Sequence, residues 1–394
     1  MPDFIFFYIN FVADIGTGMN ILINCTILRN GGSVQVGDSV CRLFCRYSGH
    51  RFVVVMPPHM TDTVSAIEHY RNVRVFIHSV DHSLLRTLRG RERFLDSLVD
   101  RFSIDCVLSV FGPSRWRPRV PHISGYGRPH PLLPDSPYFK RMSWPHRLAN
   151  RLKYRAILAG FARDSDYIFT ENEHITQLLR RRILGRPITT VTNCCNQVFD
   201  MPERWTHINL RPFDGIRVLS VTAFYPHKNL DLIVEMARLL RREHPGRKVR
   251  FVLSLDSDCL GPIEPEIQDY FEFLGPVPLS ACPLLYKDCD ISLQTSLLEC
   301  FSANYVEAMK MERPQVVTNL GFARGICGDA AAYFEPASAR SAVETLLRVA
   351  DDEVLRRSLV ESGRRRLSAF GTSEMRADRL IDLCRRLVRE KTGE

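Results

Sequence analysis

Two acidic residues in the second half of the chain are spaced so that both could contact one ligand. Glu299 and Glu307 are separated by seven residues within the segment SLLECFSANYVEAM. We expect Glu299 in a loop that follows a strand and Glu307 in the next helix. A helix that begins near Ser302 or Ala303 would present unpaired N–H groups and a positive dipole end, which suit a phosphate. An anion site beside two carboxylates predicts a sugar-nucleotide site, although a solvated helix residue and a loop charge would show the same spacing.

A lysine in the same half of the chain could neutralise a bound phosphate. The segment SVTAFYPHKNLDLI, residues 220–233, places Lys228 at the turn between a strand and a helix. A cation directed at a diphosphate stabilises the charge that builds on it as it leaves. The alternative is an exposed lysine at the start of a helix.

Paired glycines mark a third candidate, in the first half of the chain. Gly31 and Gly32, in the segment NGGSVQVGDSV, would stand between the first strand and an apolar-periodic helix. Glycine lets the backbone approach a ligand closely. The dinucleotide fingerprint G-x-G-x-x-G is absent, and an ordinary turn explains the pair equally well.

The segment around Glu299 resembles the E-x7-E signature of the family-four retaining glycosyltransferases, including the S-x-x-E-x-F opening and the E-A-M that follows. The resemblance implies that Glu299 contacts the hydroxyls of the transferred sugar and balances charge at the reacting carbon. It implies that Glu307 binds the ribose of the nucleotide. Backbone amides of Cys300, Phe301 and Ser302 would hold the diphosphate.

Residues 220–233 resemble the P-x-K segment of the same family, in which the lysine and an arginine five residues earlier clamp the donor phosphates. Lys228 matches the lysine, but Ala223 stands at the arginine position. Asn229, or an arginine from elsewhere, would have to supply the second contact. Gly31 and Gly32 match the place of the family's glycine loop beneath the donor phosphates and the acceptor.

Many members of the family carry a histidine just after a strand of the first half, close to the C6 hydroxyl of the sugar. Gly127 falls at that position here, with His122 and His130 on either side. Each of these histidines could also be structural or exposed. The surrounding residues 109–131 are rich in turn-forming, basic and aromatic types, and we expect this segment to contribute to acceptor recognition.

Short apolar, β-branched runs alternate with helical segments along the chain, which is typical of parallel α/β layers. The runs in the first half are Ile21–Asn24, Arg51–Met56, Val73–Ile77, Asp105–Val110, His122–Gly125 and Tyr167–Thr170. Those in the second half are Ile216–Thr222, Val249–Leu255, Phe271–Leu274, Ile291–Gln294 and Gln315–Thr318. Helices are expected over Leu230–Arg242, which carries an apolar stripe, and over Thr372–Arg389.

The predicted fold class is α/β, with two Rossmann-like doubly wound domains. The resemblance implies the GT-B arrangement, in which the domains face a central cleft and a C-terminal helix crosses back. A chain of 394 residues is too long for one ordinary core. We place an acceptor-side domain at residues 1–205, a nucleotide-sugar domain at residues 206–375 and the returning helix at residues 376–394. Residues 1–18 are interpreted as a dispensable extension, or as the result of a misassigned start, before a strand that begins near Met19.

The composition is that of a globular protein, with 45% hydrophobic and 25% charged residues. The formal charge of +9 predicts an anionic partner, but no nucleic-acid-binding signature accompanies it, so nucleic acid is not expected. The twelve scattered cysteines lack zinc-ligand spacing and are typical of reduced thiols in a cytoplasmic protein. We see no Asp-x-Asp pair placed to bind a metal ion, and neither a metal nor a cofactor is expected.

The segment from Lys140 to Arg163 is basic throughout, has no acidic residue and contains Trp144, Tyr154 and Phe161. A basic amphipathic segment of this kind can lie on an anionic membrane surface. The alternative is a solvated helix that packs one apolar face on the first domain.

These features, read with the resemblance, predict a hexosyltransferase, EC 2.4.1.-, that transfers a sugar with retention and without metal from a nucleotide diphosphate sugar to a glycan or lipid-linked acceptor. The implied setting is bacterial surface polysaccharide or lipopolysaccharide assembly, in the cytoplasm or at the inner face of its membrane. One alternative is a non-catalytic sugar-nucleotide-binding scaffold subunit, which Ala223 and the missing histidine favour. The other is a sugar-nucleotide epimerase, for which no acid and base pair is identified.

Overall fold

Two parallel β-sheets organise the chain. The computed structural model describes residues 18–29, 31–79, 92–140 and 142–393, so almost all of the predicted extension lies outside the described residues. The first sheet has the order β3-β2-β1-β4-β5-β6-β7 and the second β10-β9-β8-β11-β12-β13. Counted within each sheet, both begin with the order 3-2-1-4-5-6 of doubly wound nucleotide-binding folds. The predicted α/β class is confirmed.

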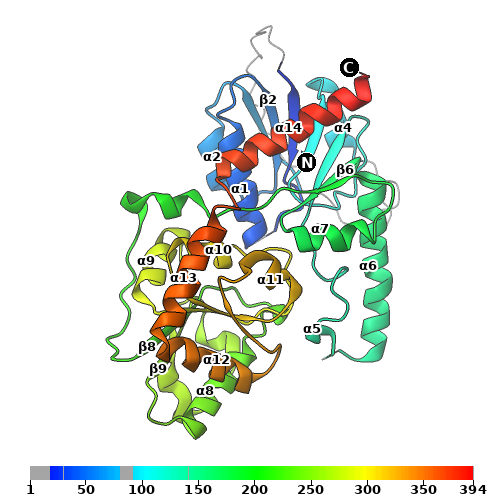
Figure 1. Ribbon diagram of the computed structural model, residues 1–394. Coiled ribbons are helices and arrows are strands. Elements are labelled where there is room, and N and C mark those ends of the chain that lie inside the picture. Colours follow the sequence, from blue (N-terminus) through cyan, green and yellow to red (C-terminus); the bar gives the residue numbers. More distant parts are fainter. Residues whose placement is uncertain (1–17, 30, 80–91, 141, 394) are drawn as a thin grey trace. The chain divides into compact units, whose positions relative to one another are not determined.

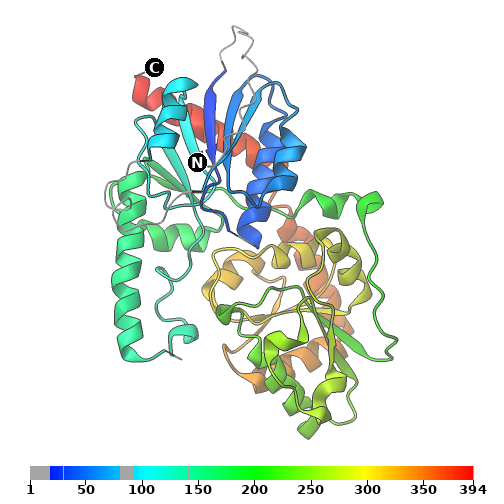
Figure 2. The ribbon, with the colours of Figure 1, turned by 180° about the vertical axis from the view of Figure 1, so that it is seen from behind.

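The strands of the first sheet follow the predicted runs to within a residue or two. They are β1 (Asn20–Asn24), β2 (Arg51–Met56), β3 (Val73–Ile77), β4 (Cys106–Ser109), β5 (His122–Tyr126), β6 (Tyr167–Thr170) and β7 (Ile188–Thr190). The strand β7 was not among the predicted runs. The helices between these strands are α1 (Gly32–Phe44), α2 (Thr61–Ile67), α4 (Arg93–Arg101), α5 (Pro137–Lys140), α6 (Trp144–Asp164) and α7 (Glu173–Arg180), and α1 and α2 lie against β1–β3 (Figure 2).

The second sheet repeats this arrangement. Its strands are β8 (Ile216–Ser220), β9 (Val249–Leu253), β10 (Phe271–Phe273), β11 (Ile291–Gln294), β12 (Gln315–Thr318) and β13 (Ala332–Phe334). Its helices are α8 (Asp231–Glu243), α9 (Cys282–Asp288), α10 (Ala303–Lys310), α11 (Gly321–Cys327), α12 (Ala339–Asp351) and α13 (Glu353–Leu367). The strand β13 was not among the predicted runs.

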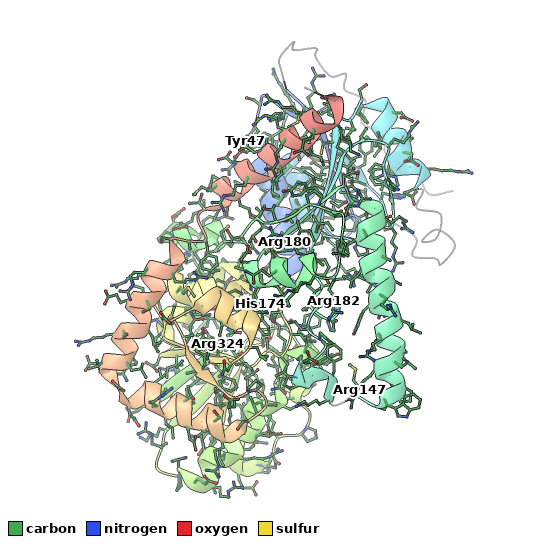
Figure 3. The ribbon with its side chains drawn as sticks, turned by 45° about the vertical axis from the view of Figure 1, so that its right-hand side comes forward. Tyr47, Arg147, His174, Arg180, Arg182 and Arg324 are labelled. Atoms are coloured by element: carbon green, nitrogen blue, oxygen red, sulfur yellow. The ribbon has the colours of Figure 1, made fainter. Side chains whose placement is uncertain are left out.

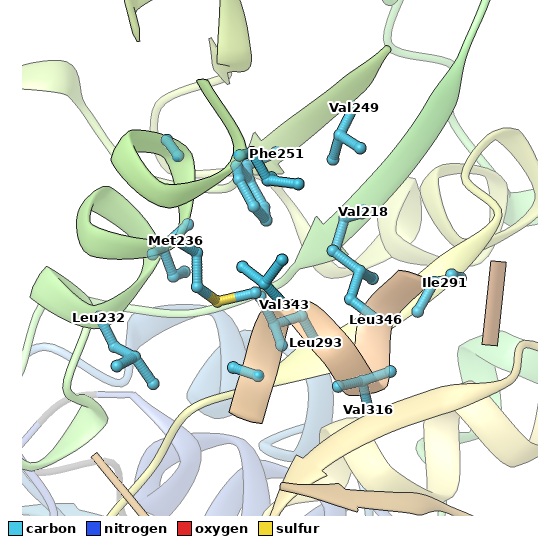
Figure 4. Packing of buried hydrophobic residues seen from close by; sticks show 14 of the residues in the cluster. Val218, Leu232, Met236, Val249, Phe251, Ile291, Leu293, Val316, Val343 and Leu346 are labelled. Atoms are coloured by element: carbon cyan, nitrogen blue, oxygen red, sulfur yellow. The ribbon is translucent and has the colours of Figure 1, made fainter. Parts of the chain in front are cut away.

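The core of the second sheet is apolar on both faces, as parallel strands require. On one face Val218, Leu293 and Val316 pack with Met236 of α8 and Val343 of α12 (Figure 4). The apolar stripe predicted for α8 is buried, and Leu232, Met236 and Leu239 beside it are buried as well. The helix is therefore covered over a wider arc than the stripe alone indicates.

The chain forms two compact units that interleave along the sequence. The first comprises Met1–Gly125, Gly160–Ile168 and Ala377–Glu394, and the second comprises Tyr126–Ala159 and Phe169–Arg376. The predicted C-terminal helix is confirmed as α14 (Ser373–Thr392), and most of it lies in the first unit (Figure 1). The Tyr47 hydroxyl donates to Asp378 of this helix at 2.6 Å. The predicted domain limits at residues 205 and 375 stay a prediction.

No helix in the described part of the chain combines the length and the apolar character needed to cross a bilayer.

Candidate functional site

Two loops meet at one edge of the second sheet. Lys228 ends the single turn η3 (Pro226–Lys228) after β8, and Glu299 follows β11. Because β8 and β11 are neighbouring parallel strands, their carboxyl ends lie side by side. The Leu297 N–H donates to the His227 carbonyl at 2.8 Å, and the Thr295 hydroxyl donates to the Lys228 carbonyl at 2.7 Å. These hydrogen bonds fix the two loops against one another.

An ion pair joins the two predicted catalytic residues. The Lys228 Nζ donates to Glu299 Oε1 at 2.5 Å, and their side chains are 15% and 11% exposed. Lys228 is therefore not the exposed helix-start lysine of the alternative interpretation. Two charges this deeply buried require each other, because removal of either leaves the other without a partner in a poorly solvated site.

Asn229 occupies the position directly after this lysine. Its φ is 54°, in the left-handed region that asparagine and glycine adopt more readily than other residues. The residue is 2% exposed, and neither its amide nitrogen nor its amide oxygen has a hydrogen-bond partner. An unsatisfied buried amide of this kind costs on the order of 1–3 kcal/mol. The predicted phosphate contact of Asn229 stays a prediction, while Ala223 is exposed as a loop residue.

The helix after Glu299 begins where the sequence predicts. Its N-cap is Ser302, and the Ser302 hydroxyl makes no capping hydrogen bond, so its first turn lacks a side-chain acceptor at that position. The Asn304 amide donates to the Val221 carbonyl and ties this turn to the end of β8. Cys300 is buried, and the Phe301 ring packs edge-on against Phe370 at a centroid distance of 6.0 Å.

Glu307 lies inside the contact between α10 and α9. Its side chain accepts a hydrogen bond from the Tyr286 hydroxyl at 3.3 Å, and the residue is 4% exposed. Burial raises the pKa of Glu307 to about 7, partly offset by that hydrogen bond. Among the described residues no hydrogen bond or ion pair joins Glu307 to Lys228 or Glu299, and its predicted contact with ribose stays a prediction.

A second group of rings borders the ion pair. The His130 and His227 rings lie 5.8 Å apart, centroid to centroid, and His227 stacks on Tyr225 at 5.5 Å. The Ser136 hydroxyl donates to the Leu297 carbonyl at 2.7 Å, which anchors the His130 segment on the loop before Glu299. Burial lowers the pKa of His130 to about 4 and also lowers the pKa of His227. Both imidazoles are therefore neutral at neutral pH.

His227 was not among the residues predicted from sequence, although its place next to Lys228 was a signal for it. His122, by contrast, is structural. Its ring lies within 2.6 Å of the Asp164 carbonyl and 2.8 Å of the Ser109 hydroxyl, and the residue is 1% exposed. Gly127 is exposed.

The paired glycines open α1 in the other compact unit. Gly31 is the N-cap with a φ of 62°, and a Cβ at Gly32 would meet open space. A left-handed N-cap explains why glycine is needed at the first position. The contact of this pair with a donor stays a prediction.

Within the described ranges no group of three or more His, Cys, Asp or Glu side chains is arranged to hold a metal ion.

Comparison with known proteins gives a family match for the part of the chain that holds these loops. Residues 203–366 match the family model for glycosyl transferases group 1, a range that contains Lys228, Glu299 and Glu307. No curated protein matches the chain.

Three solved structures similar to the chain cover nearly all of it. A glycosyltransferase from Rickettsia africae is 13% identical with a TM-score of 0.69, covering 95% of this chain and 99% of its own. A sucrose-phosphate synthase from Thermosynechococcus elongatus is 16% identical with a TM-score of 0.69, at 94% and 99% coverage. Anabaena HepE in complex with UDP and glucose is 14% identical with a TM-score of 0.64, at 93% and 99% coverage.

At these identities the likeness concerns the fold, and the family match concerns the second half of the chain. Residues 203–366 therefore match the group 1 glycosyltransferase model, and the two-sheet α/β fold of the chain matches that of GT-B glycosyltransferase structures.

Proposed function

We propose that the chain is a retaining hexosyltransferase of family four, which moves a sugar from a nucleotide diphosphate sugar to a glycan or lipid-linked acceptor. The observation that carries this proposal is the buried ion pair between Lys228 and Glu299, three residues before an uncapped helix start at Ser302. Cation, carboxylate and helix N–H groups are the functions that a departing sugar diphosphate needs.

Lys228 has N–H groups that are free to bind the phosphates of the sugar nucleotide. An ammonium group has three N–H donors, and the contact with Glu299 uses one of them. The remaining two can reach diphosphate oxygens without breaking the ion pair. The N–H groups at the start of α10 add a second source of positive potential. Asn229, with its unpaired amide, is the residue that we propose in place of the family's arginine.

The proposed reaction exchanges one bond to the anomeric carbon for another. An acceptor hydroxyl attacks the anomeric carbon from the face that the diphosphate leaves, and the bond between that carbon and the diphosphate oxygen breaks. The hydroxyl proton passes to a donor phosphate oxygen, and nucleoside diphosphate departs. The Glu299 carboxylate balances positive charge on the sugar ring, and Lys228 balances negative charge on the leaving group.

We further propose that this charge balance replaces a divalent metal and that no cofactor takes part. The test is transfer activity measured with EDTA and with manganese. Equal rates are expected, and a strict requirement for manganese would contradict the proposal.

The donor proposed first is a UDP-sugar. HepE is described in complex with UDP and glucose, and an S. aureus TarM mutant in complex with UDP and α-GlcNAc-glycerol. A setting in bacterial surface polysaccharide or lipopolysaccharide assembly remains part of the proposal. Twelve free cysteines support a reducing, cytoplasmic location, and a lipid-linked acceptor would bring residues 140–163 to the inner face of the membrane.

A thermal-shift screen of nucleotide diphosphate sugars tests donor binding, since a ligand at a hundredfold its Kd stabilises the folded state by about 2.7 kcal/mol. We expect one class of donor to raise Tm in the wild type, followed by slow donor hydrolysis that K228M and E299Q abolish. Binding without hydrolysis or transfer would favour the scaffold subunit, for which Ala223 is the supporting observation. Conversion of the donor into another sugar nucleotide would identify an epimerase.

A further inference from the structure

Helix α6 has one face that packs and one that does not. The Tyr154 ring lies 6.1 Å from both His130 and Phe139, centroid to centroid, and Phe161, seven residues further along the helix, is fully buried. Residues seven apart lie on the same side of a helix. A packed apolar face is what the alternative interpretation of residues 140–163, a solvated helix, requires. For residues 144–159 this inward face packs within the second compact unit.

A different set of apolar side chains points outward. Trp144 is 74% exposed, Leu148 51% and Leu152 64%. Their spacing of four residues places them in one row, turned away from Tyr154 and Phe161 by roughly a quarter to a half turn. Of the eight large apolar side chains that are exposed in the described chain, these three share one helix face. We call them, with the arginines described next, the α6 outer face.

Basic residues stand in the same row. Arg151 and Arg155 are seven and eleven residues after Trp144, which returns both to within about 20° of it on the helix. Both are exposed, as is Lys153, and no ion pair to a carboxylate is found for these three within the described residues. Arg147 lies in the first turn of the helix (Figure 3) and donates a hydrogen bond to the Met142 carbonyl at 2.9 Å.

The absence of acids extends beyond this face. Residues 140–163 contain seven lysines and arginines and no aspartate or glutamate. An exposed Trp and Leu row among unpaired cations suits a surface that is apolar inside and negatively charged outside. A protein partner would have to supply an acidic groove of matching shape, whereas an anionic lipid surface offers both properties over any length.

We propose that the α6 outer face docks on an anionic membrane surface, with Trp144, Leu148 and Leu152 in the headgroup and acyl boundary and with Arg151 and Arg155 on the phosphates. Trp is favoured at such interfaces, and each basic residue near an anionic surface contributes about 1 kcal/mol. The inference deepens the proposed function, because it names the surface on which a lipid-linked acceptor would be met, but binding itself needs no catalysis.

The docked helix would hold the proposed reaction near that surface. Tyr154 on the inward face contacts His130, and His130 contacts His227, the neighbour of Lys228 in sequence. All of these residues belong to the second compact unit. A short series of ring contacts therefore connects the membrane-facing helix to the Lys228–Glu299 loops.

Sedimentation with vesicles tests the proposal on the full chain. We expect binding to phosphatidylcholine vesicles that contain phosphatidylglycerol, much weaker binding to pure phosphatidylcholine, and release at high salt. R151Q/R155Q is expected to weaken binding by about 25-fold, from about fivefold for each charge. W144A/L148S/L152S is expected to weaken it by more than tenfold. L184S/V354S removes two side chains that are 82% and 79% exposed on other elements and should bind as the wild type does.

Tryptophan emission gives a second readout. Trp144 should shift to the blue with anionic vesicles, and W144F should lose the shift, because Trp116 is buried already and the half-buried Trp205 lies outside the α6 outer face. The proposal would be overturned if the wild type bound neither kind of vesicle, or if the outer-face variants bound anionic vesicles as well as the wild type does. Equal binding to neutral vesicles would overturn the anionic part of it. Donor-induced thermal shift without vesicles separates the two proposals, since outer-face variants should retain it.

Discussion

The Nζ of Lys228 and the Oε1 of Glu299 are 2.5 Å apart, although 71 positions separate the two residues in sequence. The Glu299 carboxylate compensates the charge of Lys228 at the place where the donor phosphates are proposed to bind. A donor then meets a lysine whose position is already fixed, rather than a long flexible side chain that must first be ordered.

The first prediction concerns this pair. K228M and E299Q should each lower kcat/KM by about 100-fold or more, because charge that develops in the transition state loses its partner. K248M is the matched control, since Lys248 is 66% exposed and pairs with Asp214 at the surface. Its kinetics should equal those of the wild type. The double variant K228M/E299Q should recover stability relative to K228M while staying inactive, and recovery of activity would refute the proposed roles.

The second prediction concerns the pH dependence of stability at Glu307. Its pKa is about 7 in the folded protein and about 4.5 ordinarily. Between these values the folded chain holds a proton that the unfolded chain has released, so wild-type stability falls as pH rises through the window. E307Q cannot lose stability in this way. The difference in the free energy of unfolding between E307Q and wild type should therefore shift by about 3 kcal/mol in favour of E307Q between pH 4 and pH 8.

Urea unfolding of both proteins at the two pH values measures this difference. E361Q changes a carboxyl that is 68% exposed and should keep the wild-type pH dependence. A pH-independent difference between E307Q and wild type would show that Glu307 does not titrate in this range.

The third prediction concerns His130, whose contribution to stability changes with pH in the direction opposite to that of Glu307. Its pKa falls from 6.5 to about 4 on folding, chiefly through burial and then through the neighbouring His227, Arg128 and Lys153, while Glu299 acts the other way. As pH drops below about 6.5, the unfolded chain takes up a proton that the folded chain does not, so stability decreases until about pH 4. H130Q should show a shallower decrease of Tm over this range, and H59Q, at an exposed position, should not.

The fourth prediction concerns a buried ion pair away from the loops. Arg376 donates to Glu171 at 2.7 Å, with side chains 5% and 6% exposed, and also to Asn193. R376M leaves a buried carboxylate unpaired and should cost about 3–5 kcal/mol in the free energy of unfolding. R357A removes an exposed pair with Glu353 and should change that free energy by less than about 1 kcal/mol. Similar effects of the two substitutions would mean that the Glu171 pair is solvated.

The fifth prediction concerns a close approach between α7 and α11. A Cβ at Gly325 would lie 2.9 Å from Asn172 Oδ1 and 3.2 Å from the Cβ of His174. Asn172 caps α7 and donates to the Phe322 carbonyl, so it has little room to move. G325A should lower the free energy of unfolding by about 1–3 kcal/mol. G246A, where a Cβ meets nothing within 4 Å, should be neutral or slightly stabilising.

Local sequence determined much of the fold and the chemistry of the site. The predicted strands recur as β1–β6 and β8–β12 with small shifts at their ends, because buried parallel strands are continuous apolar runs. The start of α10 after Glu299 was also predictable. The strands β7 and β13 were not predicted, although β10 has the same length of three residues and was.

Tertiary structure alone decided which of these residues meet. The sequence indicated separate tasks for Lys228 and Glu299, and only the adjacency of β8 and β11 in the sheet brings their charges together. Tertiary packing also brings His130 next to His227, nearly a hundred residues away in sequence. On one helix it covers Tyr154 and leaves Leu148 and Leu152 exposed. The physical reason is that periodicity fixes local structure and burial in general, whereas pairing across the chain depends on strand order and loop packing, which no local pattern encodes.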